Sequence, residues 1–421
     1  MKQGLRFFTI PRSLEEKIFL YMASAIAFSI PFKPSFNSAL SITLLVFWLL
    51  FMEKKFERQR IRILILISTL FWIALVGMLT TQNSEEGWFR IQQKSLLIIF
   101  PLVFGTIAIN WQNQLKWIVS FFMAGVILAC LICLCGAIKY WILFNDTQRF
   151  FEHGLVESVV FYPYIMALLC LMSILVITEA YMGNLKLHAW LHNRTTIFSL
   201  IFSLSVFILL LSVKQIIILW IIFFIFYSVR IPKSRTIVVL ILLLCLLTVL
   251  SIFYLPRLRE KIDEITDFKE NSIPLDEDSS LGRNWNGVAV RKAIWICAFD
   301  VIQNNLFFGV GTGDGHDALQ ASYEKRQFYF ASRYNRYNAH NQFIQVLVTF
   351  GIIGFSLWLG SLFLLFIKLK SNRLVVGLLG CLMFAMITES MLETNKGSLL
   401  MAFPITVFAF AALNKNKLIV E

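Results

Sequence analysis

The chain has 421 residues, of which 58% are hydrophobic, and it carries a formal net charge of +13 at pH 7. A water-soluble protein cannot bury so large a share of apolar side chains, so the composition excludes an ordinary soluble domain. In a membrane protein an excess of Lys and Arg follows the topology of the loops, so the positive charge does not predict nucleic acid as a partner. Apolar runs of about 17–25 residues recur, which is the length that crosses a hydrocarbon core of about 30 Å. We therefore predict an all-α polytopic integral membrane protein.

About twelve transmembrane helices are predicted from these apolar runs. The run over 195–229 is too long for one span, so we expect a tight turn near Ser212 within it. Nine spans fall within residues 1–254 and three within residues 341–421, and one large loop over 255–340 separates the two groups. The predicted spans are 18–32, 36–52, 61–80, 95–109, 115–143, 158–182, 195–211, 214–229, 235–254, 341–367, 374–391 and 397–413.

Lys and Arg are concentrated in loops that share one side of the membrane with the N-terminus, at 53–62, 230–235 and 368–373. Because cytoplasmic loops carry this excess, we expect both chain termini in the cytoplasm. Long loops translocate largely regardless of their charge, so the loop over 255–340 is expected on the opposite side. In a bacterium this topology predicts a multi-pass protein of the inner membrane with a periplasmic loop.

The large loop is the only polar stretch long enough to build a site. Its sequence predicts short helices over 257–268 and 288–303, an irregular segment over 269–286 between them, and a glycine-rich break at Gly309–Asp314. The glycines lack the βαβ context of a dinucleotide site, and the adjacent carboxylates of 276–278 cannot all face one ion. We therefore predict no cofactor and no metal.

His340 lies where this loop meets the apolar helix of span ten, and Asn338 is predicted to cap that helix. A histidine at a helix N-terminus faces the positive end of the helix dipole, which favours the neutral imidazole. A neutral imidazole can accept a proton, so His340 is a candidate general base. The alternative is an interfacial histidine that hydrogen-bonds water or a backbone carbonyl.

Two cations are predicted on the same side of the membrane as His340. Arg291 lies in the predicted loop helix and presents a planar fork of donors that matches phosphate oxygens. Lys214 follows the tight turn, where its stem can reach the interface. Together they suit an anionic substrate carried on a lipid. Further candidates for substrate binding are Arg283, Arg333, Arg336 and Asn341, although solvated charges or contacts with lipid headgroups also explain the arginines. Glu389 and Glu393 are expected at the end of span eleven, on one helix face, and are additional candidates.

Three local patterns resemble the O-antigen ligase and polymerase superfamily of bacterial envelope proteins. They are the Ser-Val-Lys segment within 211–215, the helix and glycine turn over 291–311, and the His-Asn segment with its glycines over 339–354. The order of spans and loop is similar as well. The resemblance implies that His340 activates an acceptor hydroxyl and that Arg291 binds the diphosphate of an undecaprenyl-linked glycan. Lys214 stands in place of a second family arginine, which is a departure because Lys lacks bidentate geometry.

The resemblance therefore predicts an integral-membrane glycosyltransferase of the C type. It would move a glycan from undecaprenyl diphosphate to lipid A–core on the periplasmic face, without a metal and with inversion, among membrane lipids. One alternative is a polymerase that extends the glycan on its undecaprenyl carrier. Another is a lipid or glycan transporter without chemistry. The transporter is disfavoured because the predicted spans contain few charges and the polar groups gather at one face.

Overall fold

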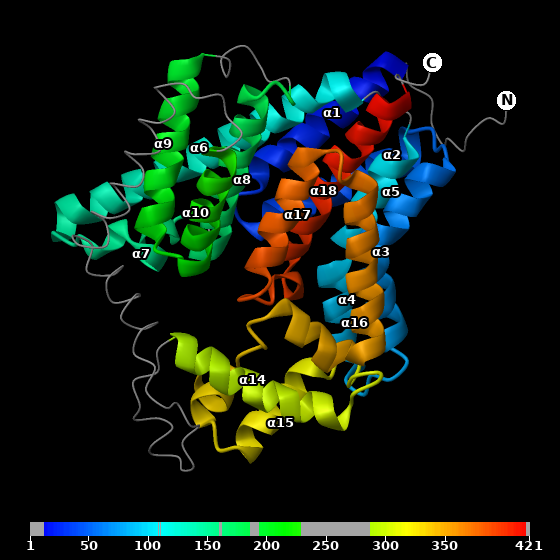
Figure 1. Cartoon of the computed structure of the whole chain (residues 1–421), viewed down its shortest axis with the longest axis vertical. Coiled ribbons are helices and arrows are strands. Elements are labelled where there is room, and N and C mark those ends of the chain that lie inside the picture. The colour runs from blue at the N-terminus through cyan, green and yellow to red at the C-terminus, as the bar shows by residue number, and fades with distance from the viewer. Residues whose placement is uncertain are drawn as a thin grey trace.

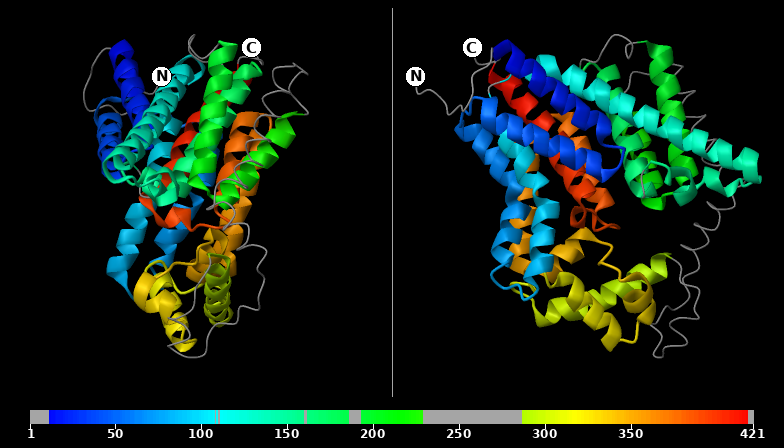
Figure 2. Two further views of the ribbon diagram at one scale, coloured as in Figure 1. Left: turned by 90° about the vertical axis from the view of Figure 1, so that its left-hand side faces the viewer. Right: turned by 180° about the vertical axis from the view of Figure 1, so that it is seen from behind.

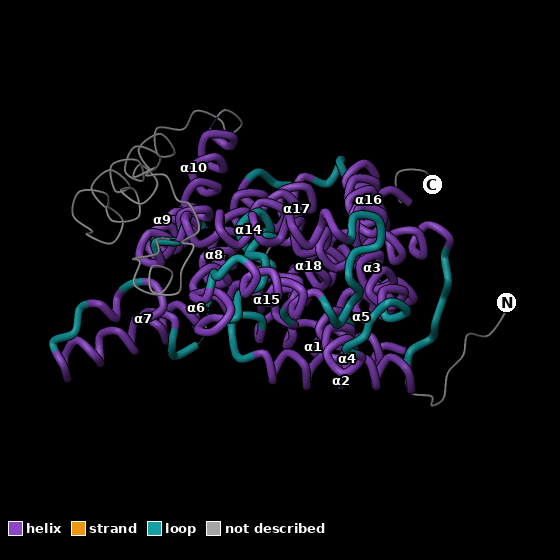
Figure 3. The backbone as a smooth tube through the Cα atoms, turned by 90° about the horizontal axis from the view of Figure 1, so that it is seen from below, coloured by secondary structure: helices purple, strands orange, loops and turns teal. Residues whose placement is uncertain are grey.

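The computed structural model describes residues 12–107, 109, 111–159, 162–185, 193–228 and 287–417. Every regular element within these ranges is a helix (Figure 3). The predicted all-α class is thereby confirmed for the described part of the chain. The ninth predicted span, 235–254, and the predicted loop helix 257–268 lie outside these residues.

The helices before the undescribed stretch follow the predicted apolar runs closely. The tight turn near Ser212 is confirmed, because one helix ends at Leu211, Ser212 takes a left-handed φ of 52° and the next helix begins at Lys214. The bounds are α1 Arg12–Ser29, α2 Pro34–Phe51, α3 Arg58–Gly77, α4 Ser84–Lys94, α5 Leu96–Thr106, α6 Trp111–Phe144, η1 Gln148–Phe150, α7 Glu152–Val156, α8 Pro163–Tyr181, α9 Arg194–Leu211 and α10 Lys214–Ser228.

The C-terminal part begins with the predicted loop helix, which is one residue longer at each end than expected. A second helix of the loop, α15, was not predicted. The bounds are α14 Gly287–Asn304, α15 Gly315–Lys325, a π-helical turn η3 Phe330–Asn335, α16 Gln342–Leu369, α17 Arg373–Ala385, η4 Met391–Glu393 and α18 Asn395–Lys417.

Seven helices in the described part are long and apolar enough to cross a membrane. They contain the segments 34–51, 58–77, 114–144, 163–181, 194–211, 342–369 and 395–413, and two shorter apolar helices cover 214–227 and 373–385. The fourth predicted span is only the short α5, which follows α4 after Ser95. These helices agree with a polytopic membrane protein, while the count of twelve spans stays a prediction.

The apolar helices form a bundle, and α14 and α15 lie together at one end of it (Figures 1 and 2). The start of α1 and the end of α18 lie toward the other end (Figure 1). Seen along the bundle, α14 and α15 cross its end (Figure 3). They enclose a hydrophobic cluster of their own, to which Ile294, Leu319 and Tyr323 contribute, and the first turns of α16 close it with Ile344 and Val348. We call residues 287–340 the end domain.

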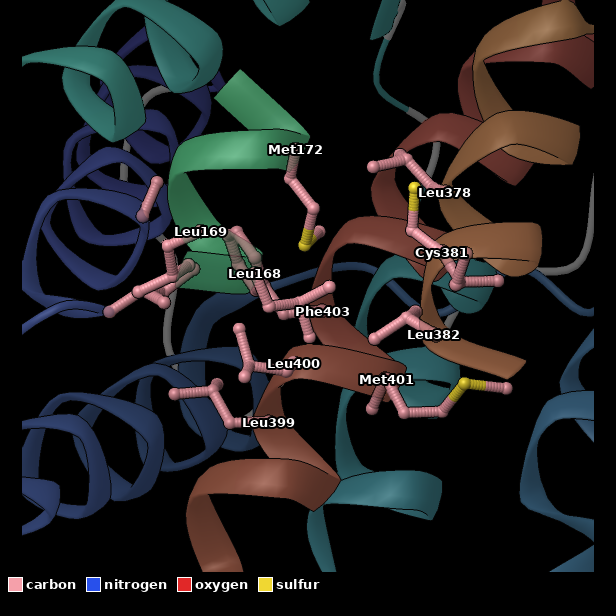
Figure 4. Close-up of a cluster of buried hydrophobic side chains, with 14 of the residues drawn as sticks. Leu168, Leu169, Met172, Leu378, Cys381, Leu382, Leu399, Leu400, Met401 and Phe403 are labelled. Atoms are coloured by element: carbon pink, nitrogen blue, oxygen red, sulfur yellow. The ribbon is translucent and has the colours of Figure 1, made fainter. Parts of the chain in front are cut away.

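Inside the bundle, α17 packs against both α8 and α18, and apolar side chains of the three helices gather around a small cavity (Figure 4). Met172 of α8, Leu378 of α17 and Phe403 of α18 point toward one another there, and all three are almost fully buried. Lipid tails are as apolar as these side chains, so close packing rather than exclusion of water stabilises such contacts between spans. This core fixes α17 and α18, and the segment that joins them reaches the end domain.

We expected the spans to be nearly free of buried charge, and of the charged side chains that are buried in the described residues only Glu179 lies within a predicted span. Five charged side chains are buried among the described residues, each in the first or last turn of its helix: Glu15, Arg60, Lys94, Glu179 and Lys396. Lys396, for example, donates to Asn37 Oδ1 at 2.6 Å. Transporters place ionisable groups near the middle of the membrane, so charges at helix ends still do not indicate transport.

Candidate functional site

Glu389 joins two of the predicted site residues from segments far apart in the sequence. Its Oε1 accepts a hydrogen bond from Arg291 Nη2 at 2.9 Å, and its Oε2 lies 3.4 Å from His340 Nδ1. Arg291 belongs to α14, His340 precedes α16, and Glu389 follows α17. The His340 side chain is 25% exposed and the Glu389 side chain 16%, so the cluster borders solvent without being dispersed in it. We call these three side chains the Glu389 cluster.

The backbone around His340 is held tightly, which fixes the direction of the imidazole. His340 takes a left-handed φ of 43°, and its N–H donates to Asn338 Oδ1 at 3.0 Å. On the preceding residue, the Ala339 N–H donates to Gln345 Oε1, and its carbonyl accepts from Trp295 Nε1 at 3.0 Å. A non-glycine residue held at positive φ is strained, and such strain gathers at functional sites.

The cap of α16 differs from the prediction. Asn341, and not Asn338, is the N-cap residue, because its Oδ1 accepts from the N–H groups of Phe343 and Ile344. Asn338 instead holds the N–H of His340. The two asparagines lie on either side of His340, and sequence preference alone could not say which one ends the loop.

The contact with Glu389 determines which nitrogen of the neutral His340 imidazole carries the proton. A carboxylate only accepts hydrogen bonds, so in the neutral imidazole the proton belongs on Nδ1, toward Glu389. The other nitrogen, Nε2, then carries the lone pair. Tyr337 packs edge-on against the imidazole, with ring centroids 5.1 Å apart. Burial raises the pKa of Tyr337, against the opposing charge of Arg291, so its phenol stays neutral.

Arg291 is oriented by three described hydrogen bonds. Besides the bond to Glu389, its Nε donates to the Thr388 carbonyl at 3.3 Å and its Nη1 to the Gly287 carbonyl at 3.1 Å. A guanidinium has five N–H donors in a fixed plane, so two of them remain for an anion. The arginine is therefore held in position while keeping donors for a ligand.

Glu389 and Glu393 do not share a helix face, as the sequence suggested, because α17 already ends at Ala385. Glu393 turns away from the Glu389 cluster and accepts from Lys94 Nζ of α4 at 2.8 Å and from Gln342 Nε2 at 3.4 Å. Burial opposes the charge of Glu393, but Lys94, Arg90 and the hydrogen bonds outweigh it and lower the pKa of Glu393. Sequence patterns gave no signal for Lys94, which is only 2% exposed.

The remaining predicted residues have separate surroundings. Half-buried Lys214 begins α10, which packs against α17 and so stands beside the helix that leads to Glu389. Arg333 lies 3.8 Å from Glu324 and stacks 4.0 Å over the Tyr329 ring, both within the end domain.

Arg336 is exposed, and its carbonyl lies 3.1 Å from His316 Nε2. Asn341 uses its side chain as the helix cap, and its N–H donates to Ser390 Oγ at 3.1 Å. Arg283 lies outside the described residues. Among the residues that are described, no group of three or more His, Cys, Asp or Glu side chains is arranged to hold a metal ion.

The helices and this site define a multi-pass membrane protein whose polar cluster lies between the bundle and a small end domain. The family model of O-antigen ligase matches residues 190–359, which include Lys214, Arg291 and His340 and end before Glu389. Over these residues, less than half of the chain, the protein is O-antigen ligase-like, which confirms the resemblance. The similarity to a ligase family is consistent with a glycosyltransferase-like enzyme. A comparison with curated proteins finds no match.

Proposed function

We propose that this protein transfers a glycan from undecaprenyl diphosphate to a sugar of lipid A–core at the periplasmic face of the bacterial inner membrane. The observation that carries the proposal is the Glu389 cluster. One carboxylate binds a histidine that can act as a base and an arginine that can bind phosphate, on the end of the bundle that carries the end domain. The family match supplies the reaction class, glycosyl transfer.

In the proposed step, the oxygen of an acceptor hydroxyl attacks the anomeric carbon of the donor sugar. A new glycosidic C–O bond forms while the bond from that carbon to the diphosphate oxygen breaks, and its electron pair leaves with undecaprenyl diphosphate. The acceptor proton passes to Nε2 of His340, and the resulting imidazolium is stabilised by the Glu389 carboxylate. Attack in line with the leaving group inverts the anomeric carbon.

Arg291 is the proposed ligand of the departing diphosphate. Its two remaining N–H donors match phosphate oxygens, and the bonds to Glu389, Thr388 and Gly287 position them before the donor binds. Lys214, at the start of α10, is the proposed source of a second positive charge, as a point charge rather than a fork. We assign the stabilisation of the developing negative charge to these two cations and none of it to a metal.

The test is transfer by purified protein in proteoliposomes that contain an undecaprenyl-diphosphate glycan and a lipid A–core acceptor, without added metal. We expect His340→Ala to lower the rate by about 10²–10⁴-fold, the usual contribution of a general base. His316→Ala is the matched control, because His316 is a partly exposed histidine of the end domain outside the Glu389 cluster. It should keep the wild-type rate. An undiminished rate in His340→Ala would overturn the proposed role.

The acceptor separates ligase from polymerase. A ligase forms product only when lipid A–core is supplied, whereas a polymerase lengthens the glycan on undecaprenyl diphosphate from the donor alone. A deletion strain gives the same answer in cells. Loss of all capped lipopolysaccharide supports the ligase, and capping with a single repeat unit supports the polymerase.

A further inference from the structure

Three consecutive apolar residues stand out from the surface of the end domain just after α14. Leu306, Phe307 and Phe308 are 46%, 63% and 69% exposed. Scattered apolar residues are normal on a surface, but a contiguous exposed patch marks a contact with a partner or a membrane. We call residues 306–308 the apolar tip.

The apolar tip lies against a break in α16. At Gly351 the backbone takes φ 63° and ψ −169°, so the helix is interrupted inside its apolar run. A Cβ on Gly351 would come within 2.4 Å of the Phe307 carbonyl oxygen, so only glycine allows the tip this close. The glycine break and the apolar tip therefore form one packed unit.

The backbone groups at this break are hydrogen-bonded across it. The N–H groups of Ile352 and Ile353 donate to the carbonyls of Leu306 and Phe307 at 2.8 and 3.2 Å. In the other direction, Val310 and Gly311 donate to the carbonyls of α16 residues just before the break, at 3.1 and 3.0 Å. Irregular backbone is tolerated at membrane depth only where its polar groups are satisfied within the protein. The carbonyls of Leu306 and Phe307 and the N–H groups of α16 just after the break are satisfied in this way.

The two parts of α16 differ in surroundings. Before Gly351 most residues are buried by the end domain and the bundle, whereas after it Ile352, Ile353 and Leu357 lie exposed on an apolar helix face. The later part, 352–369, has a length of roughly 27 Å at 1.5 Å per residue, close to a hydrocarbon core of about 30 Å. A hydrocarbon core matched to residues 352–369 has Gly351 at one edge.

The neighbouring end of α3 continues the same apolar surface. A Cβ on Gly77 would touch Thr312 and Phe350, which places this end of α3 beside the glycine turn and the break. Val76 and Leu79 are both strongly exposed there. The apolar tip therefore lies in the same region as the exposed apolar residues of α16 and of the end of α3.

We propose that Leu306, Phe307 and Phe308 insert among the acyl chains of the leaflet on the side of the end domain, and so anchor that domain to the membrane. The partner is the lipid bilayer itself. Its place beside the end of α3 and the break in α16 puts the tip at the edge of the hydrocarbon, and the hydrogen bonds of the Leu306 and Phe307 carbonyls lower the cost of entry. This inference requires only that the helices span a membrane, and it is independent of the proposed glycosyl transfer.

The first test uses the unmodified chain. The protein is reconstituted with lipids that carry a photoactivatable diazirine on the acyl chain, irradiated and mapped by mass spectrometry. We expect adducts on residues 306–308 as well as on the exposed face of α16. Adducts on the peptide that contains Leu357 without any on 306–308 would overturn the proposal.

A second measurement gives the depth of the tip. Spin labels are placed at Phe307→Cys, at Leu357→Cys on the α16 face, and at exposed Ala321→Cys on α15, in a chain whose native cysteines are replaced by alanine. Phe307→Cys should resemble Leu357→Cys, with access to oxygen and protection from a water-soluble nickel relaxant. Behaviour like that of Ala321→Cys would refute the insertion. A disulfide-linked dimer through position 307 would do so too, because a second copy would then cover the tip.

Discussion

Two carboxylates on the segment between α17 and α18 have different roles. One belongs to the candidate site, and the other pairs with a buried lysine. Only Ser390, Met391 and Leu392 separate Glu389 from Glu393. Glu389 holds His340 and Arg291, whose side chains keep 25% and 29% of their surface exposed, whereas Glu393 holds the almost fully buried Lys94. One short segment thus supplies a carboxylate with partly exposed partners to the candidate site and a carboxylate with a buried partner to the fold. The comparison predicts that substitutions at the two positions will separate activity from stability.

The largest expected effect is on stability, at Glu393. Glu393→Gln leaves the buried ammonium of Lys94 without its carboxylate, and breaking a buried pair in this way costs about 3–5 kcal/mol. The measurement is the free energy of unfolding in mixed micelles. The double variant Lys94→Met with Glu393→Gln should recover much of the loss, because it removes the unpaired charge as well. Equal stability of single and double variants would contradict the pairing.

A smaller effect is expected on activity, at Glu389. Glu389→Gln should slow transfer by about 10- to 100-fold, the rate equivalent of roughly 1.5–3 kcal/mol for a hydrogen bond to a charged group. Its free energy of unfolding should stay near the wild-type value, since the cluster borders solvent.

Two further variants separate a positioning role of Glu389 from a structural one. Glu389→Asp keeps the carboxylate and should restore part of the rate. In a His340→Ala background, Glu389→Gln should lower the transfer rate little further, because the effects of residues that act as a unit are not additive. Additive losses would show that Glu389 does not act through the histidine.

The smallest effect is expected from an exposed ion pair in the end domain. Arg326 Nη2 donates to Asp300 Oδ1 at 2.7 Å, and this hydrogen bonding lowers the pKa of Asp300. A lowered folded-state pKa stabilises the protein above the unfolded value of about 3.9 and ceases to do so as the pH falls through the folded value. Both side chains are partly solvated, so Asp300→Asn should cost less than about 1 kcal/mol at neutral pH.

The free energy of unfolding of wild type and of Asp300→Asn, measured at neutral and at acidic pH, tests this direction of the pH dependence. The difference between them should shrink toward zero as the pH falls below the folded pKa of Asp300. A difference that grew with acidity would mean that the carboxylate is not stabilised by Arg326.

Local sequence patterns predicted His340 and Arg291 of the candidate site, but not the carboxylate that joins them. His340 and Arg291 stood out because each lies in a short motif at a loop or helix boundary. Their common partner Glu389 was only a candidate, since nothing in the sequence says that residues separated by 98 positions meet at one carboxylate. The burial of Lys94 could not be predicted, because a lysine at the end of an amphipathic helix is expected to be solvated unless its partner is known.

The fold shows the same limit. Long apolar runs predicted most of the described helices of the bundle, and the tight turn near Ser212 was predicted because the run was too long for one helix. The short helices α4 and α15 were missed, because both are too polar on average to stand out as apolar runs. The break at Gly351 was missed as well, because it depends on the approach of Phe307 and not on the glycine alone.

The pair of Lys94 and Glu393 has a consequence for how the protein is made. Its partners are 299 residues apart, so the lysine is synthesised long before its carboxylate. At about 5–20 residues per second the ribosome needs roughly 15–60 s to bridge that interval. During this time Lys94 lacks its carboxylate partner, and the Glu389 cluster cannot assemble either. The Glu389 cluster and the pair of Lys94 with Glu393 therefore form at the same late stage of synthesis, when the segment after α17 leaves the translocation machinery.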